Sequence, residues 1–120
     1  MLKRLSKSIA DAGRGIVYTF KNEQNFRIQI GCAIIVLILA NYFSVRSWQL
    51  ILLILLILLV LVMELLNTAV EKFADLLVPR LHHYIEVVKN IMAAAVLLTS
   101  IGAALIGIII FYPHFIELLK

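Results

Sequence analysis

Three long apolar stretches dominate the chain. No charged residue lies between Ile28 and Val45, and the run from Trp48 to Met63 is almost entirely leucine and isoleucine. A third apolar run extends from Asn90 to Tyr112. A helix that crosses a bilayer needs about 20 mostly apolar residues, with about 17 as the lower edge. The pattern therefore predicts three transmembrane helices, over residues 28–45, 48–78 and 89–112.

The first 26 residues follow a different pattern. Apolar side chains recur at helical spacing, and basic side chains lie between them. The apolar set is Leu2, Leu5, Ile9, Ile16, Val17 and Phe20. This spacing predicts an amphipathic helix over residues 1–26 that lies in the headgroup plane, bent or broken near Gly13 and Gly15. A basic, partly frayed tail is the alternative.

The ends of the predicted helices are marked by polar residues and prolines. Residues 41–47 are predicted to form a tight turn. The second helix has no Gly or Pro before Pro79, so we expect it to project beyond the membrane to Val78. Pro113 is expected to end the third helix, and residues 79–86 to form a short connection. Small residues repeat every four positions in the third span and favour close helix packing: Ala95, Thr99, Ala103 and Gly107.

Composition supports a membrane protein of one domain. Apolar residues make up 63% of the 120 residues and charged residues 15%, whereas soluble domains are roughly half apolar and about a quarter charged. The single cysteine, Cys32, cannot form an intrachain disulfide. The chain has no zinc-ligand spacing and no glycine-rich phosphate loop. These absences argue against a zinc site and against a soluble nucleotide-binding fold.

The distribution of basic residues predicts the topology. Six lysines and arginines precede the first span. Three more, Lys72, Arg80 and Lys89, lie between the apolar run that ends at Met63 and the one that begins at Asn90, but only Arg46 lies in the first loop and only Lys120 follows the third span. Cytoplasmic loops carry the excess of basic residues. We therefore expect a multi-pass membrane protein with its N-terminus and second loop in the cytoplasm and its first loop and C-terminus outside.

Acidic and amide side chains gather where the second helix leaves the membrane. Glu64, Asn67, Glu71 and Asp75 are spaced i, i+3, i+7 and i+11. At about 100° per residue they fall within roughly 80° of one helix face. An ionisable group at the edge of the hydrocarbon is costly and points to function. The alternative is a solvated helix end whose acids are incidental, and it suits Asp75 better than Glu64.

Three carboxylates on one face repel one another, so something must offset their charge. Mg²⁺ is a natural candidate, because it is held by one or two carboxylates together with water and nucleotide phosphates. Glu23, just before the first span, could complete such a site with Glu71. Lys89 could neutralise nucleotide phosphates, or its side chain could simply reach the membrane surface.

These residues carry a resemblance to a known family. The stretch Glu64-Leu-Leu-Asn-Thr-Ala-Val-Glu71, the later Val88-Lys89-Asn90-Ile-Met-Ala-Ala-Ala-Val-Leu and the earlier Asn22-Glu23-Gln24-Asn25-Phe26-Arg27 resemble small bacterial membrane kinases. These are prokaryotic diacylglycerol kinase and the related undecaprenol kinase. The similarity covers nearly the whole chain, including the order of three spans after an amphipathic helix.

The resemblance implies a homotrimer whose active sites are shared between subunits. It implies that ATP, with Mg²⁺, donates its γ-phosphoryl group to a lipid hydroxyl. Glu64 is then the general base, and Asn67 orients the lipid or the base. Glu23 and Glu71 are implied to bind the metal. The same two residues are implied to bind the nucleotide, together with Asp75, Lys89, Asn90 and Arg14. The residues implied to contact the lipid are Glu64, Asn67 and Arg27.

One position departs from the family pattern, and several functions stay open. The family usually has Lys-Asp where this chain has Lys89-Asn90, so a weakened or inactive relative that acts as a small membrane assembly protein is the alternative. The kinase is kept as the main hypothesis because the set Glu64, Asn67, Glu71 and Lys89 is otherwise complete. A small ion carrier that uses Glu64 is a third hypothesis. Among lipids, the tail from Ile101 to Pro113 resembles undecaprenol kinases, which favours undecaprenol over diacylglycerol.

Overall fold

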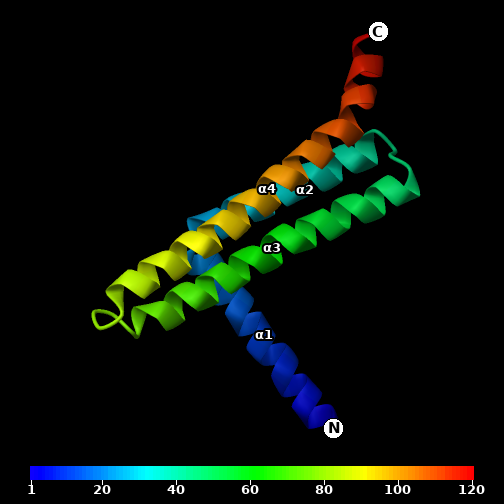
Figure 1. Ribbon diagram of the computed structural model, residues 1–120. Coiled ribbons are helices and arrows are strands. Elements are labelled where there is room, and N and C mark those ends of the chain that lie inside the picture. The colour runs from blue at the N-terminus through cyan, green and yellow to red at the C-terminus, as the bar shows by residue number, and fades with distance from the viewer.

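The structure is a computed structural model that describes residues 1–120, and it is entirely helical. It contains four helices: α1 (Leu2–Asn22), α2 (Gln24–Tyr42), α3 (Ser47–Asp75) and α4 (His82–Leu119) (Figure 1). Helices α2, α3 and α4 are each long and apolar enough to cross a membrane. The prediction of an all-α membrane protein with three such helices is therefore confirmed.

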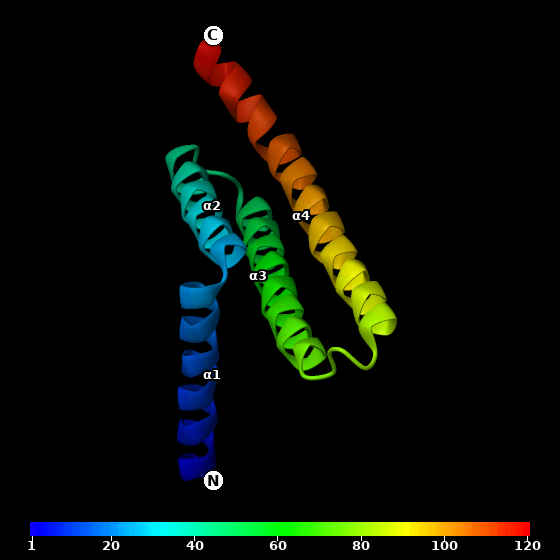
Figure 2. The same ribbon diagram turned by 90° about the vertical axis from the view of Figure 1, so that its left-hand side faces the viewer.

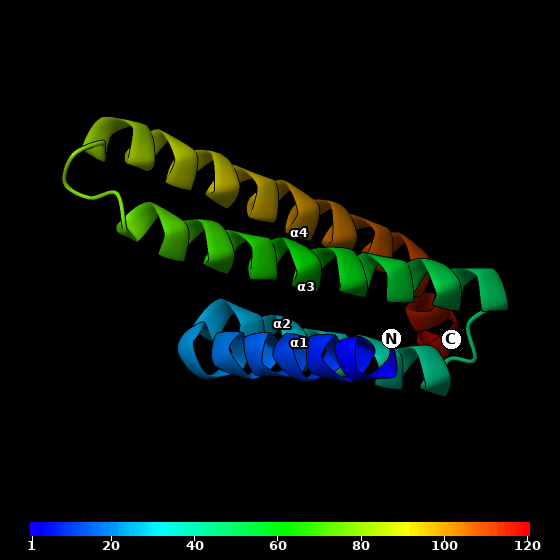
Figure 3. The ribbon, with the colours of Figure 1, turned by 90° about the horizontal axis from the view of Figure 1, so that it is seen from below.

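Helix α3 is the central element of the bundle. It packs antiparallel to α4 along most of its length, and it also contacts α2 and α1. Figure 3 shows this order, with α3 between α4 on one side and α1 with α2 on the other. Helices α2 and α4 do not come into close backbone contact with each other. The side chains of α3 thus meet every other part of the chain.

The buried core is small and lies where the α2–α3 turn meets α4. Ala40, Leu53, Ile110 and Phe111 form it, and the Phe43 ring lies 6.2 Å from that of Phe111. Most other large apolar side chains are exposed. In water such a surface would be a liability, but in a bilayer it faces lipid chains that are equally apolar.

The turn between α2 and α3 is a helix-capping motif without a glycine. Ser44 adopts a left-handed conformation with φ 51°. Its N–H donates to the carbonyl of Asn41, and the N–H of Val45 donates to the carbonyl of Ala40. This pair of bonds is the Schellman arrangement, which satisfies carbonyls that the helix end leaves free. Gln49, the one polar residue in the apolar start of α3, accepts the N–H of Arg46 and caps that helix.

The junction between α1 and α2 sets the direction of the N-terminal helix. Glu23 is extended there, with φ −116° and ψ 111°. The Arg27 guanidinium donates to the carbonyls of Phe20 and Lys21, at 2.7 and 3.0 Å, and so caps the C-terminal end of α1. Helix α1 therefore leaves the bundle beside α3 and points away from it (Figures 1 and 2).

Several predicted boundaries were wrong. Helix α4 does not end at Pro113 but continues to Leu119. A proline costs a helix one backbone hydrogen bond, and membrane helices tolerate it because stopping would expose more unpaired groups. Helix α4 bends toward this end instead (Figure 1). Helix α1 is not broken at Gly13 or Gly15, since each glycine costs only about 1 kcal/mol.

Other boundaries shift by a few residues. Helix α3 ends at Asp75 rather than Val78, and the connection occupies residues 76–81 rather than 79–86. The residue before a proline disfavours helical geometry, so the helix stops ahead of Pro79. Helix α2 begins at Gln24 and ends at Tyr42, ahead of the expected 28–45, because the extended Glu23 starts it and the left-handed Ser44 stops it.

Ser44→Gly should stabilise the fold. A side chain at positive φ costs about 1 kcal/mol, and glycine avoids that cost, so we expect a gain of about 0.5–1 kcal/mol in the free energy of unfolding. Denaturation in mixed micelles would measure it. Ser47→Gly is the control, because Ser47 begins α3 with helical geometry and should gain nothing. Equal effects at the two positions would contradict the left-handed turn.

Candidate active site

Glu64 is the most deeply buried side chain in the protein. It is 1% exposed, and neither carboxylate oxygen has a hydrogen-bond partner. Thr68, one turn along α3, does not supply a hydrogen bond to the carboxylate, because its hydroxyl donates to the backbone carbonyl of Glu64, at 2.9 Å. Buried polar groups are almost always paired, and an unpaired buried carboxyl group is expensive. The unpaired carboxylate oxygens of Glu64 therefore indicate a functional role, such as binding a ligand or a proton.

Amides and carboxylates from three segments surround Glu64. The side chains of Asn67, one turn along α3, and Gln29, on α2, lie beside its carboxyl group. The carboxylates of Glu23 and Glu71 lie near enough to act on it electrostatically. The α1–α2 junction and α3 thus bring together Glu23, Glu64, Asn67 and Glu71, four of the residues that the sequence singled out.

Lys89 and Asp75 form a second polar contact farther along α3. Lys89 Nζ lies 2.8 Å from Asp75 Oδ1, which ties the end of α3 to the start of α4. Both side chains remain about half exposed, so the pair contributes little to stability and can exchange for other partners. Asp75 follows Glu64 by 11 residues, which is about 16 Å along a helix axis. Within one chain, the Lys89–Asp75 pair therefore lies well away from Glu64 along the axis of α3.

The remaining predicted residues lie apart from the cluster. Arg14 is exposed on α1 and pairs with Asp11 of the same helix. Arg27 caps α1. Asn90 follows Lys89 on α4 and is exposed. Lys72 was not predicted; its Nζ lies 5.9 Å from the ring centre of Tyr18 and links α3 to α1.

Gln29 is the neighbour of Glu64 that the sequence reasoning missed. Its signal was present, because it is an isolated polar residue near the start of the first apolar stretch. A polar side chain in a membrane helix usually faces protein or a polar cavity. Only the packing of α2 on α3 shows that it faces Glu64.

Glu23 and Glu71 have the chemistry to hold a nucleotide-associated Mg²⁺. No three acidic, histidine or cysteine side chains gather as a ready-made metal site. Mg²⁺ in nucleotide enzymes is commonly held by one or two carboxylates, with phosphate and water oxygens as the other ligands. Each of the two carboxylates could therefore serve as one ligand of an ion that arrives with nucleotide phosphates.

Comparison with known proteins decides the family. Residues 10–111 match the sequence profile described as prokaryotic diacylglycerol kinase. The chain belongs to this family. The matched range contains every candidate site residue from Arg14 to Asn90. The resemblance seen in the motif around Glu64 is confirmed.

Two relatives extend the match over most of the chain. An undecaprenol kinase from Bacillus subtilis is 35% identical over 114 residues, which cover 93% of this chain and 91% of that protein. A diacylglycerol kinase from Synechocystis is 33% identical over 109 residues, or 90% of this chain, but only 62% of that protein's own length. Both names denote lipid kinases, so the chain is a membrane protein of a prokaryotic lipid-kinase family.

Glu64→Gln should raise stability even if it abolishes function. The amide has the shape of the carboxylate but carries no charge to desolvate, so we expect a gain of about 1–3 kcal/mol in the free energy of unfolding. Denaturation in mixed micelles at neutral pH would measure it. Glu86→Gln, at an exposed site on α4, should change nothing. A loss of stability in Glu64→Gln would mean that a favourable interaction holds the carboxylate.

Proposed function

We propose that this protein is an ATP-dependent lipid kinase that transfers the γ-phosphoryl group of ATP to the hydroxyl of a membrane lipid, with undecaprenol favoured over diacylglycerol. The observation that carries the proposal is the buried Glu64 carboxyl group without a hydrogen-bond partner. It lies on an apolar helix of a lipid-kinase family chain, near the side-chain amides of Asn67 and Gln29. A base at that depth can meet a hydroxyl at the end of a membrane lipid.

The proposed reaction uses few protein groups. The lipid hydroxyl oxygen attacks the γ-phosphorus, the bond from that phosphorus to the bridging oxygen breaks, and ADP leaves. Glu64 accepts the hydroxyl proton, and Asn67 orients the lipid or the base. Phosphoryl transfer asks a protein mainly for positioning, for electrostatic neutralisation and for one proton acceptor. A short helical chain can supply these without a soluble nucleotide-binding fold.

The proposed nucleotide contacts lie on the side of Glu64 away from the membrane centre. Glu23 and Glu71 would hold Mg²⁺, which neutralises phosphate charge when bound. The Lys89 side chain would leave Asp75 and bind a phosphate of the nucleotide instead. The exposure of both side chains supports such a change of partner. Asp75, Asn90 and Arg14 are the other proposed nucleotide-binding residues. Arg27 is proposed to contact the lipid together with Glu64 and Asn67.

The proposed kinase is a homotrimer with shared sites, as the family resemblance implies, and the spacing along α3 supports the sharing. Lys89 is tied to Asp75, about 16 Å from Glu64 along the axis. A phosphoryl group within reach of a hydroxyl at Glu64 would therefore meet the Lys89 of a neighbouring subunit more readily than that of its own.

We place α1 on the membrane surface, because its apolar side chains, such as Leu2, Leu5 and Ile9, are exposed and alternate with basic ones. The proposed location is the bacterial inner membrane, with the active site in the cytoplasm and the C-terminus outside.

Undecaprenol is the favoured substrate on two grounds. The alignment with the undecaprenol kinase covers 91% of that relative, whereas the alignment with the diacylglycerol kinase covers 62% of the other. The end of α4 also keeps the proline that follows the last apolar run in the undecaprenol kinases that this chain resembles. The weakened or inactive alternative has only Asn90 in its favour, since the rest of the set, Glu64, Asn67, Glu71 and Lys89, is present.

A lipid-kinase assay on three proteins tests the proposal. Wild type should transfer labelled phosphate from ATP to undecaprenol faster than to diacylglycerol. Glu64→Gln should lose about 100-fold or more, since a general base contributes about 10²–10⁴-fold. Asn90→Asp should be as active as wild type or more so, because it restores the carboxylate usual in the family. No transfer to either lipid by wild type would contradict the kinase, and equal rates would contradict the preference for undecaprenol.

Mixing two inactive variants tests the shared site. Glu64→Gln and Lys89→Met subunits should each be inactive alone. In random mixed trimers, about one quarter of shared sites would draw an intact Glu64 from one subunit and an intact Lys89 from the next. We therefore expect about one quarter of wild-type activity. An inactive mixture, with mixed trimers shown by differential tags, would place the whole site within one chain.

A further inference from the structure

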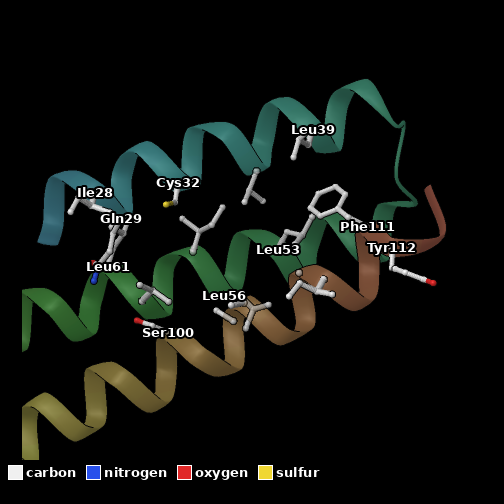
Figure 4. Close-up of a pocket in the computed structure, with 18 of the residues that line it drawn as sticks. Ile28, Gln29, Cys32, Leu39, Leu53, Leu56, Leu61, Ser100, Phe111 and Tyr112 are labelled. Carbon is white, nitrogen blue, oxygen red and sulfur yellow. The ribbon is translucent and has the colours of Figure 1, made fainter. Parts of the chain in front are cut away.

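Helix α1 is held to the bundle only near its C-terminal end. Residues 1–18 are exposed, and Thr19 is the one buried residue of the helix. Helix α2, in contrast, is held against α3 at both ends. Ala40 is buried in the core near one end, and Gln29 reaches toward α3 beside Leu61 near the other (Figure 4). The direction of α1 therefore depends on a few contacts around its last turns.

The last turn of α1 is capped at its junction with α2. Four carbonyl groups there accept hydrogen bonds from the residues that follow. The donors are the Asn22 side chain for Tyr18, the N–H of Glu23 for Thr19, and the Arg27 guanidinium for Phe20 and Lys21. These bonds satisfy the helix end, but they lie next to the extended Glu23, where the chain turns. Bonds so close to a pivot do little to hold the far end of α1 in one direction.

Lys72 supplies a contact between α3 and α1 that lies farther from the pivot. Its Nζ is 5.9 Å from the centre of the Tyr18 ring. A cation within about 6 Å of an aromatic ring centre is attracted to the ring. Tyr18 precedes Glu23 by five residues, which is about 7.5 Å along a helix axis. Because the contact acts at that distance from the turn, it resists a swing of α1 better than the capping bonds do.

The same lysine lies beside the acidic cluster. Glu71 and Glu23 are near enough to Lys72 to act on it electrostatically. The two carboxylates repel each other, and a positive charge between α3 and the α1–α2 junction offsets that repulsion. Part of the positive charge that the acidic cluster requires is therefore built into the fold.

We propose that Lys72 is a positioning residue whose contact with Tyr18 fastens α1 to α3 and so keeps Glu23 beside Glu71 and Glu64. The inference rests on the proposed function, in which Glu23 binds the metal of the nucleotide, and it adds what keeps Glu23 in place. Lys72 acts through Tyr18 and the junction and touches no reacting group. The competing explanation is a solvated lysine that has no hold on α1.

The direction of α1 can be measured without catalysis. Nitroxide labels on Ser8→Cys and Glu86→Cys, in a Cys32→Ala background, report the distance between exposed sites on α1 and α4. Vesicles without ATP and with an excess of unlabelled protein restrict the pulsed electron spin resonance signal to distances within one chain. A cation on an exposed ring shifts an equilibrium about two- to fivefold, so Lys72→Met should raise the population with a displaced α1 by that factor. Lys72→Arg should restore the original distribution.

Lys3→Met is the matched control for the distance measurement. It removes a lysine charge from α1 about 22 Å before Tyr18, so it should leave the distribution unchanged. An unchanged distribution in Lys72→Met, or an equal change in the control, would overturn the role of Lys72. A displaced α1 in Lys72→Met, in a protein whose wild type transfers no phosphate, would support that role and contradict the kinase, so the two claims fail separately.

Kinetics test the consequence for the nucleotide. Lys72→Met and Tyr18→Leu should each raise the KM for Mg·ATP about two- to fivefold and leave the KM for the lipid alcohol unchanged. Tyr18→Leu keeps the lysine charge, so its effect reports the contact itself. The double variant should be no worse than Lys72→Met, because both changes remove the same contact. Additive effects would show two separate defects, and equal rises in both KM values would show a general loss of structure; either result would overturn the positioning role.

Discussion

The burial of one carboxyl group constrains the rest of this structure. Glu64 lies on an apolar helix, is screened from solvent and has no hydrogen-bond partner. Burying it costs free energy, and the Thr68 hydroxyl does not recover that cost because it donates to a backbone carbonyl. The helices around it are arranged so that α3 contacts every other helix, and the α1–α2 junction brings Glu23 and Gln29 beside the same group. The fold thus keeps an unpaired carboxyl group beside a cluster of acidic and amide side chains.

This arrangement answers a problem that every enzyme acting on a membrane lipid faces. The lipid hydroxyl is attached to a chain that must stay in hydrocarbon, whereas ATP stays in water. A helix that carries a base at the edge of its apolar stretch and acids beyond it can serve both. The half-exposed Lys89–Asp75 pair joins the end of α3 to the start of α4, about 16 Å from Glu64 along the α3 axis. No separate nucleotide domain is required.

The sequence predicted much of this, because membrane helices leave clear periodic signals. The three spans and the row from Glu64 to Asp75 could be read from hydropathy and helical spacing alone. Helix ends could not, because the left-handed Ser44 turn and the passage of α4 through Pro113 depend on packing and on the cost of free backbone groups in lipid. The position of Gln29 beside Glu64 was missed because the sequence does not show which face of α2 packs against α3. The roles assigned to the site residues remain predictions from the family resemblance.

The most direct measurement is the carboxyl carbon resonance of Glu64 in protein labelled at its glutamate side chains, assigned by its loss in Glu64→Gln. Adding a polyprenol should shift this resonance, because the hydroxyl donates to the carboxyl group, and the matching hydrocarbon should leave it in place. The exposed Glu86 should not respond to either. A Glu64 signal that is indifferent to the alcohol, at concentrations where phosphoryl transfer proceeds, would contradict its role as the group that receives the lipid hydroxyl.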